Sequence, residues 1–362
     1  MSITARDERY MREAIELSLA HVGQTGPNPS VGCVIVKDGE VVGRGVTALG
    51  GRPHAEPQAI AEAGEKARGA TAYVTLEPCS HHGKTPPCAN AIVASGIARV
   101  VVAVADPDPR VSGRGLKILA DADIEVTIGI LQKEARRAMS GYLTRQTKGR
   151  PQVTLKLAVS ADGMLGRVGA GQVAITGPAA RETVHRLRAE SDAILVGIGT
   201  ALADDPELTV RLPGLESASP VRIVLDRKAE LPVTSKLVKT AASVPVLVAV
   251  SPGASGNRAA LGDKGVDVVE VGGIEELLAL LAQRGISSLM VEGGARVAAD
   301  LLARGLVDRI HLYDSSVIVG EGGIASPITA GRLPAGFVKV DERQVGADRL
   351  QIFERLPASA WV

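Results

Sequence analysis

The sequence has few aromatic residues and almost no net charge. Aromatic side chains make up 2% of the 362 residues, too few and too scattered for a surface that stacks nucleic-acid bases. The 41 basic and 40 acidic side chains are dispersed along the chain and leave a formal net charge of +1. Such a balance provides no cationic surface for a polyanion, so we expect no nucleic-acid partner.

Long hydrophobic runs are missing as well, and cysteine is scarce. No apolar run reaches the roughly 20 residues that a membrane-spanning helix needs. The first ten residues mix acids with bases, unlike the apolar core of a signal peptide. Three cysteines cannot build a disulfide framework and favour metal or thiol chemistry instead. The sequence therefore predicts a cytoplasmic protein without membrane contact.

Apolar runs that alternate with Ala-rich stretches predict two α/β domains, since 362 residues exceed what one core organises. In the first half we expect strands at 31–36, 71–76, 99–105 and 124–128. Helices are expected at 7–21, 55–63, 88–95, 116–120 and 131–144. A polar connection with Gly149 and Pro151 spans residues 145–152. These signals indicate a first domain at 1–146, with helices on both faces of a sheet, and a second at 152–358.

The second half repeats the alternation of strands and helices. Strands are expected at 153–160, 193–196, 221–225, 246–250, 266–271, 288–292 and 309–313, with helices at 178–190, 274–283 and 295–303. Residues 253–264 are expected to form a polar, Gly-rich loop, and little beyond residue 325 indicates function.

Four residues of the first half have the types and order of a zinc deaminase site. His54 and Glu56 open an expected helix, Cys79 follows an expected strand, and Cys88 begins another helix. A catalytic zinc uses three protein ligands and keeps one position open. Two thiolates neutralise much of the metal's charge, so a carboxylate base becomes necessary, and Glu56 fits that need. The known signature pairs H-x-E with P-C-x-x-C, the glutamate being an acid/base and not a ligand.

The spacing of the two cysteines departs from that signature. Eight residues, 80–87, separate Cys79 from Cys88 where the signature has two. An excursion of this length typically carries substrate contacts. The alternative is a closed structural zinc site in which His81 or His82 supplies a fourth ligand, which would leave Glu56 without a role.

The motifs of the first half resemble the RibD family of bifunctional riboflavin-biosynthesis deaminase–reductases. They follow that family's order and spacing, including the long cysteine spacing: Pro27-Asn28-Pro29, Val31-Gly32, His54-Ala55-Glu56, Thr75-Leu76-Glu77-Pro78-Cys79-Ser80-His81-His82-Gly83, Thr85-Pro86-Pro87-Cys88 and Asp106-Pro107. The resemblance implies a cytidine-deaminase-like α/β/α sandwich with one zinc ion (Zn2+) per chain, bound by His54, Cys79 and Cys88.

The resemblance also implies that Asn28, His81 and Lys84 contact the pyrimidinone and ribose phosphate of the substrate. On residue type alone, Asn28 between two prolines favours a turn, and Lys84 suits a solvated surface. The family has histidine where this sequence has Thr47, and commonly also at Gln58.

The second half by itself carries only weak signals for a nucleotide site. Gly197 and Gly199 follow an expected strand, but Leu202 stands where the dinucleotide fingerprint requires its third glycine. Residues 292–295 lie between a strand and a helix, where free amides could hold a phosphate, although a plain turn suits them equally.

The resemblance continues through the second half at Leu155-Lys156-Leu157, Ser160-Ala161-Asp162-Gly163, Ile175-Thr176, Leu187-Arg188, Leu202-Ala203-Asp204-Asp205-Pro206, Leu208-Thr209-Val210-Arg211 and Val291-Glu292-Gly293-Gly294. It implies a dihydrofolate-reductase-like α/β domain that binds NADPH through Ala158, Ala174, Thr200, Asp204, Gly294, Ala295, Arg296, Val297, Ala298, Ala299 and Asp300.

The family's reductase substrate positions are Gln172, Arg188, Leu208, Arg211 and Glu292 here, and Lys156 is the expected proton donor or carbonyl polariser. On residue type alone, the arginines also suit surface salt bridges and Asp204 suits a helix cap. Ala174 stands where the family often has tryptophan.

Together these features predict zinc-dependent deamination of a phosphoribosylaminopyrimidine, followed by NADPH-dependent reduction of its ribosyl group. The partners expected are these small molecules and further copies of the chain, in a dimer or tetramer. Two other hypotheses stay open from the sequence alone. One is a tRNA or nucleoside deaminase whose second half only binds, and the other is a non-catalytic zinc module.

Overall fold

The computed structural model describes residues 5–81 and 86–356. The chain divides into two compact units, Met1–Arg150 and Pro151–Val362. Within the described ranges, no helix combines the length and the apolar character required to cross a membrane.

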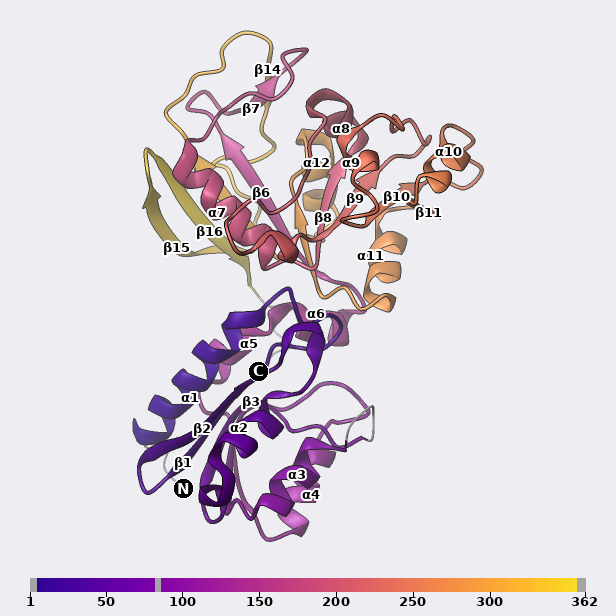
Figure 1. Ribbon diagram of the computed structural model, residues 1–362. Coiled ribbons are helices and arrows are strands. Elements are labelled where there is room, and N and C mark those ends of the chain that lie inside the picture. The colour runs from indigo at the N-terminus through magenta and orange to yellow at the C-terminus, as the bar shows by residue number, and fades with distance from the viewer. Residues whose placement is uncertain (1–4, 82–85, 357–362) are drawn as a thin grey trace. The chain divides into compact units, whose positions relative to one another are not determined.

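The first unit is built on a five-stranded sheet in the order β2-β1-β3-β4-β5; β1, β2 and β3 are labelled in Figure 1. Its strands are β1 (Gly32–Lys37), β2 (Glu40–Val46), β3 (Thr71–Leu76), β4 (Arg99–Val104) and β5 (Glu125–Ile128). β1 runs antiparallel to both β2 and β3, while β3, β4 and β5 are parallel. The central strands β3 and β4 are buried along almost their whole length, as expected for parallel strands covered on both faces.

Helices cover both faces of this sheet. α1 (Ala5–Ser18) packs on β1 and β3 and contacts α5 (Gln132–Ala138). On the other face α2 (Ala55–Ala63) contacts α3 (Cys88–Ser95), which in turn contacts α4 (Arg114–Asp121). The unit is the sandwich that the alternation predicts.

Two glycines of β2 set how closely α2 approaches the sheet. A Cβ atom on Gly45 would lie 2.0 Å from the Ala55 carbonyl oxygen, and one on Gly43 would lie 2.2 Å from that of Ala59. Any side chain at either position would push the helix away. Since α2 begins at Ala55, these glycines hold residues 54 and 56 against the sheet.

The first unit differs from the sequence prediction in two places. The single helix expected at 131–144 is broken at Met139 into α5 and α6 (Ser140–Lys148), because Met139 has non-helical angles of φ −107° and ψ 19°. Strand β2 was not predicted, because its two glycines interrupt the apolar alternation on which strand prediction depends.

The second unit is built on a nine-stranded sheet in the order β11-β10-β9-β8-β12-β6-β13-β16-β15. Its strands are β6 (Gln152–Val159), β8 (Ala193–Gly197), β9 (Val221–Leu225), β10 (Val246–Val250), β11 (Asp267–Glu270), β12 (Ser288–Val291), β13 (Arg309–Asp314), β15 (Phe337–Val345) and β16 (Asp348–Arg355). The pairs from β11 to β13 are parallel, and β16 and β15 add antiparallel strands at one edge.

Two apolar cores lie on the two faces of this sheet. α7 (Pro178–Ala189), α9 (Lys236–Lys239) and α10 (Arg258–Asp263) contribute to one of them. α11 (Ile274–Gln283) and α12 (Ala295–Ala303) contribute to the other. The short helix α8 (Ile198–Asp204) follows β8, and a separate two-stranded sheet pairs β7 (Met164–Arg167) with β14 (Gly323–Ala325).

The sequence prediction for the second unit was incomplete: it did not include β7, α8, α9 and β14, and it missed the elements of two further segments. Residues 253–264, predicted as a loop, contain α10, which buries Leu261 in the core. The region beyond residue 325 forms β15 and β16. β15 was not recognised because it is an edge strand with mostly exposed, charged side chains and little apolar alternation.

Candidate active sites

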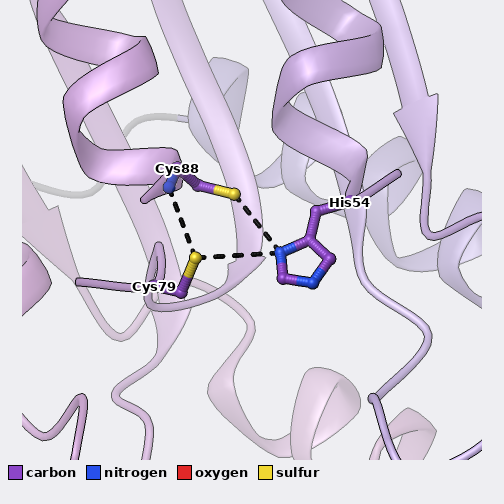
Figure 2. A group of neighbouring side chains, drawn as sticks. All are labelled: His54, Cys79 and Cys88. Carbon is purple, nitrogen blue, oxygen red and sulfur yellow. Dashed lines mark hydrogen bonds between the residues drawn. The ribbon is translucent and has the colours of Figure 1, made fainter. Parts of the chain in front are cut away.

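Three side chains from separate elements of the first unit converge on one point (Figure 2). His54 directly precedes α2, Cys79 follows β3, and Cys88 is the first residue of α3. Their ligand atoms all lie within 4.8 Å of one another. The His54 Nδ1 atom is 3.3 Å from the Cys88 sulfur and 3.7 Å from the Cys79 sulfur.

These separations fit a bound zinc ion. Tetrahedral zinc, with bonds of about 2.3 Å to sulfur and about 2.0 Å to nitrogen, separates two such ligand atoms by roughly 3.5 Å. His54 therefore presents Nδ1 to the metal position. In the described part of the chain only three residues form this cluster, and His81 is not one of them. The fourth ligand that a closed zinc site would take from His81 is therefore not in place in this structure, and His82 lies outside the described residues.

Glu56 lies in the first turn of α2 with only 4% of its surface exposed. Burial raises the pKa of Glu56 to about 6, and the nearby Cys79 thiol group adds to the increase. The pKa of Cys79 is lowered to about 4, chiefly because the Cys88 thiol donates a hydrogen bond to its sulfur. A carboxylate with a pKa near neutrality beside the metal position suits proton transfer in both directions.

The residues expected around the deaminase substrate are partly placed. Asn28 donates a hydrogen bond of 2.9 Å from Nδ2 to the Gly51 carbonyl, which fixes its loop. His81 is half-buried, and its Nδ1 atom has no hydrogen-bond partner among the described residues. Lys84 lies outside the described residues.

The two positions that differ from the family pattern bind backbone groups instead. The Thr47 hydroxyl accepts a hydrogen bond of 3.0 Å from the Val31 amide, and Gln58 donates one of 2.9 Å to the carbonyl of the ligand residue His54. Both side chains thus stabilise the surroundings of the site.

Glu77, which sequence reasoning did not assign a role, ties the metal-ligand loop to α4. Its carboxylate is buried and accepts hydrogen bonds from the amides of Asp106, Gly113, Gly115 and Leu116 at 3.2, 3.1, 3.1 and 3.4 Å. Two of these donors lie in the first turn of α4, where amides lack partners within the helix. Because Cys79 follows two residues later, Glu77 fixes the base of the metal-ligand loop.

Replacing Glu77 by glutamine should therefore weaken zinc binding as well as stability. The amide would face buried N–H donors with an NH2 group, at a cost of about 2–3 kcal/mol in the free energy of unfolding. We expect zinc affinity, measured by chelator competition, to fall by about 10–100-fold. Glu134→Gln, an exposed substitution in the same unit, is the control. Unchanged zinc affinity and melting temperature in Glu77→Gln would contradict this role.

In the second unit three charged side chains meet in a buried cluster. Lys156 lies on β6, Arg188 on α7 and Glu292 directly after β12, with side chains 16%, 11% and 14% exposed. Arg188 donates two hydrogen bonds, of 2.7 and 3.1 Å, to the Glu292 carboxylate, and Lys156 Nζ lies 4.0 Å from it. Burial lowers the pKa of Lys156, an effect that the Glu292 charge opposes.

The expected substrate segment adjoins this cluster. Arg188 Nη1 donates a hydrogen bond of 3.0 Å to the Thr209 carbonyl, between the predicted residues Leu208 and Arg211. Leu208 is buried, whereas the Arg211 guanidinium is half-exposed and pairs with Glu207 at 3.3 Å. Gln172 lies on an exposed loop.

His185, also missed from the sequence, holds the far end of this segment. Its Nδ1 atom accepts a hydrogen bond of 3.2 Å from the Arg211 amide. Burial and the neighbouring Arg188 and Arg211 charges lower the pKa of His185, which favours the neutral ring that this hydrogen bond requires. The available signal was its spacing, since His185 is three residues before Arg188 on one face of α7.

Part of the expected cofactor set is brought together at the ends of β8 and β12. A Cβ atom on Gly294 would lie 3.2 Å from the Thr200 hydroxyl, and one on Gly197 would lie 2.8 Å from Val297. The starts of α8 and α12 are therefore adjacent, and the run from Ala295 to Asp300 forms the first turns of α12. Three further members lie elsewhere: Ala158 on β6, Ala174 on an exposed loop and Asp204 at the end of α8.

Comparisons with known proteins match both units. The cytidine and deoxycytidylate deaminase zinc-binding region matches residues 4–104, and the RibD C-terminal domain matches residues 151–348. Riboflavin biosynthesis protein RibD of Aquifex aeolicus (strain VF5) is 43% identical over 318 residues, covering 87% of this chain and 88% of that protein. The chain belongs to the RibD family.

Further RibD proteins support the assignment. That of Escherichia coli (strain K12) is 41% identical over 338 residues, covering 87% of this chain and 89% of the relative. The structure of Acinetobacter baumannii RibD (form 1) is 38% identical with a TM-score of 0.88, covering 97% of this chain and 99% of that one. A Thermotoga maritima structure, described as a diaminohydroxyphosphoribosylaminopyrimidine deaminase/5-amino-6-(5-phosphoribosylamino)uracil reductase, has a TM-score of 0.86, 35% identity and the same coverage.

The family membership confirms the sequence predictions of fold class and activity. The protein is a bifunctional deaminase and reductase of riboflavin biosynthesis. The deaminase match is a zinc-binding region whose three candidate ligands are in place, and the reductase domain implies NADPH. A tRNA deaminase with a merely binding second half and a non-catalytic zinc module are both set aside.

Proposed function

We propose that the first unit deaminates 2,5-diamino-6-(5-phosphoribosylamino)pyrimidin-4-one with zinc held by His54, Cys79 and Cys88. The second unit then reduces the product, 5-amino-6-(5-phosphoribosylamino)uracil, with NADPH to the ribityl compound. The observation that supports the first step most strongly is the three-ligand cluster beside the buried Glu56 carboxylate.

In the deamination, zinc when bound supplies a Lewis acid that makes water a stronger nucleophile. Glu56 takes a proton as the water oxygen attacks the amino-bearing ring carbon. It then passes that proton to the departing amino group, so that ammonia leaves, and the remaining hydroxyl proton moves to the adjacent ring nitrogen to give the ring carbonyl. The other proposed contacts are Asn28 and His81 to the substrate and Lys84 to its phosphate.

In the reduction, NADPH when bound supplies the hydride for C1′ of the sugar. Lys156 donates a proton to the oxygen of the opening ribose, and its burial favours the loss of that proton. Glu292 orients both Lys156 and Arg188. The Arg188 guanidinium already donates two hydrogen bonds to the Glu292 carboxylate. The half-exposed Arg211 is therefore the better ligand for the substrate phosphate.

The remaining assignments concern the rest of both sites and the state of the protein. Gln172 and Leu208 complete the reductase substrate site, and the cofactor residues are those at the starts of α8 and α12 with Ala158, Ala174 and Asp204.

A cytoplasmic homo-oligomer, a dimer or a tetramer without nucleic acid, is proposed. The free cysteines suit a reducing compartment, and light scattering after size exclusion tests the oligomer.

One product analysis tests both halves together. The zinc-loaded protein is incubated with the diamino substrate, and products are identified by mass. Without NADPH we expect only the deaminated uracil and ammonia, and with NADPH the ribityl product as well. Reduction of the diamino substrate before deamination would contradict the proposed order.

A further inference from the structure

Arg222, in strand β9, is a completely buried arginine that donates its described hydrogen bonds to neutral groups. It is 0% exposed. Its Nη1 atom donates hydrogen bonds to the Glu207 carbonyl at 3.1 Å and the Thr240 hydroxyl at 2.7 Å. Its Nη2 atom donates to the carbonyls of Thr240, at 3.1 Å, and Val244. Burial lowers the pKa of Arg222 to about 10, so the guanidinium is still charged at neutral pH.

Such a residue is costly in an apolar core. A buried charge loses its hydration, and here carbonyl and hydroxyl oxygens and the charge of Glu207, which accepts no hydrogen bond from Arg222 through its carboxylate, offset only part of that loss. An aliphatic side chain would fill a position in β9 without this cost. The presence of an arginine at this buried position is therefore explained by the backbone groups that it binds.

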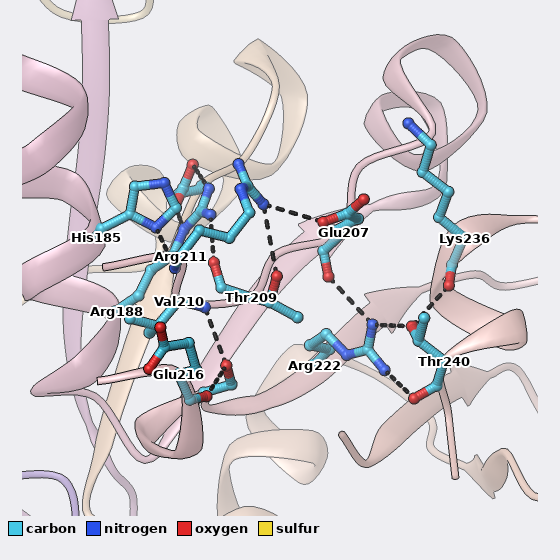
Figure 3. Close-up of polar contacts among 12 residues, drawn as sticks. His185, Arg188, Glu207, Thr209, Val210, Arg211, Glu216, Arg222, Lys236 and Thr240 are labelled. Carbon is cyan, nitrogen blue, oxygen red and sulfur yellow. Dashed lines mark hydrogen bonds and ion pairs between the residues drawn. The ribbon is translucent and has the colours of Figure 1, made fainter. Parts of the chain in front are cut away.

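Arg222 holds one end of the segment Glu207–Arg211. Four hydrogen bonds fix the backbone of this segment (Figure 3). Arg222 holds the Glu207 carbonyl, and Arg188 holds that of Thr209 at 3.0 Å. Ser219 Oγ accepts from the Val210 amide at 3.0 Å, and His185 accepts from the Arg211 amide at 3.2 Å.

The segment requires this support because its backbone is strained. Within the segment Leu208 adopts φ +58°, and Asp205, two residues before the segment, adopts φ +38°; both lie in the left-handed region that non-glycine residues seldom adopt. Strain of this kind persists only where the surroundings over-determine the conformation. The Asp205 carboxylate accepts from the Lys236 amide at 2.9 Å, at the start of α9, while Arg222 contacts Thr240 directly after α9. Residues 205 and 207, which precede Leu208, are thus both linked to α9 or to the residue directly after it.

We propose that Arg222 is a positioning residue for the reductase substrate. Its hydrogen bonds link the Glu207 carbonyl to Thr240, directly after α9, and so fix the positions of Leu208 and Arg211. This inference rests on the proposed function, in which Leu208 and Arg211 contact the substrate. The guanidinium is suited to the task because its two Nη atoms reach separate sets of acceptors. A lysine would keep the charge, but its single nitrogen cannot span both sets.

The test uses Arg222→Met and Arg222→Lys in the full chain. For Arg222→Met we expect the reductase KM for 5-amino-6-(5-phosphoribosylamino)uracil to rise about tenfold or more, with kcat within about threefold, because uniform binding is lost. Arg222→Lys should be intermediate. The Kd of NADPH and the rate of ammonia release should stay within about twofold, since neither depends on this segment.

Two further variants serve as controls. Arg284→Met removes an exposed arginine of the same unit, paired with Asp267 at the start of β11, and should leave all constants unchanged. Should Arg222→Met fail to fold, Thr240→Val removes the hydroxyl that accepts a hydrogen bond from Arg222 and should raise the same KM by a smaller factor.

A KM that stays unchanged in folded Arg222→Met, or in Thr240→Val when that variant takes its place, would overturn the inference. A parallel loss of kcat and NADPH affinity would do so as well, since it indicates a merely structural role. Arg211→Ala separates this failure from failure of the proposed function. If Arg211→Ala raises KM but Arg222→Met does not, only the positioning role is wrong. If neither raises KM, the substrate assignment of the segment is wrong as well.

Discussion

Glu56→Gln should reduce ammonia release by about 10²–10⁴-fold while one zinc ion per chain and the reductase activity are retained. The amide has the shape of the carboxylate but cannot take up a proton from water at neutral pH. The three metal ligands are untouched by the substitution, and the buried amide is no longer a charge in an apolar setting. We therefore expect neither metal loss nor unfolding.

Ammonia release, metal content and NADPH oxidation with the deaminated intermediate are measured on the same preparation. Glu62→Gln is the matched control, because Glu62 lies on the same helix α2 but is exposed. If both activities fell together in Glu56→Gln, with zinc retained and the fold intact, the model of two separate sites would be wrong.

Lys156→Met should reduce the reductase rate by about 10²–10⁴-fold and leave deamination unchanged. Methionine fills a similar volume but carries no proton to donate. The fold should tolerate the change, because Glu292 keeps both of its hydrogen bonds from Arg188 and is not left as an unpaired buried charge. The loss should appear in kcat more than in the Kd of NADPH.

Single-turnover oxidation of NADPH, followed by absorbance, measures this effect, with NADPH affinity determined separately. Lys264→Met, at an exposed position of the second unit, is the control. A Lys156→Met enzyme with near-normal kcat would exclude Lys156 as proton donor and would transfer that role to another group near the sugar.

The sequence predicted several elements to the residue, and these share one property. α2, α3 and β3 in the first unit, and β9, β10, α11 and α12 in the second, have the bounds expected from their apolar patterns. Each is largely covered by other elements, so its pattern directly reflects what it buries. β2 and β15 escaped prediction because glycines in one and an exposed edge in the other remove that pattern.

The metal ligands could also be predicted from the sequence, whereas the residues that support the metal-ligand loop and the segment Glu207–Arg211 could not. His54, Cys79, Cys88 and Glu56 are recognised by type and spacing, because zinc chemistry needs those donors. Glu77 binds backbone amides 29–39 residues away, His185 binds an amide 26 residues away, and Arg222 binds backbone carbonyls 15–22 residues away. Backbone groups are the same in every residue, so no side-chain pattern shows which ones will be contacted.

The reductase half was identified through the family resemblance, because its own nucleotide motifs are weak. What the sequence determined by itself is the donor set of the first half, three candidate zinc ligands and a carboxylate. Side-chain type and order suffice to identify these donors, since both can be read directly from the amino-acid sequence. Only the tertiary structure decided that His81 lies outside the metal cluster and that the Arg188 guanidinium donates two hydrogen bonds to Glu292. It also decided that the strained segment Glu207–Arg211 is held by a buried arginine, because distance, burial and partnership exist only once distant segments have packed together.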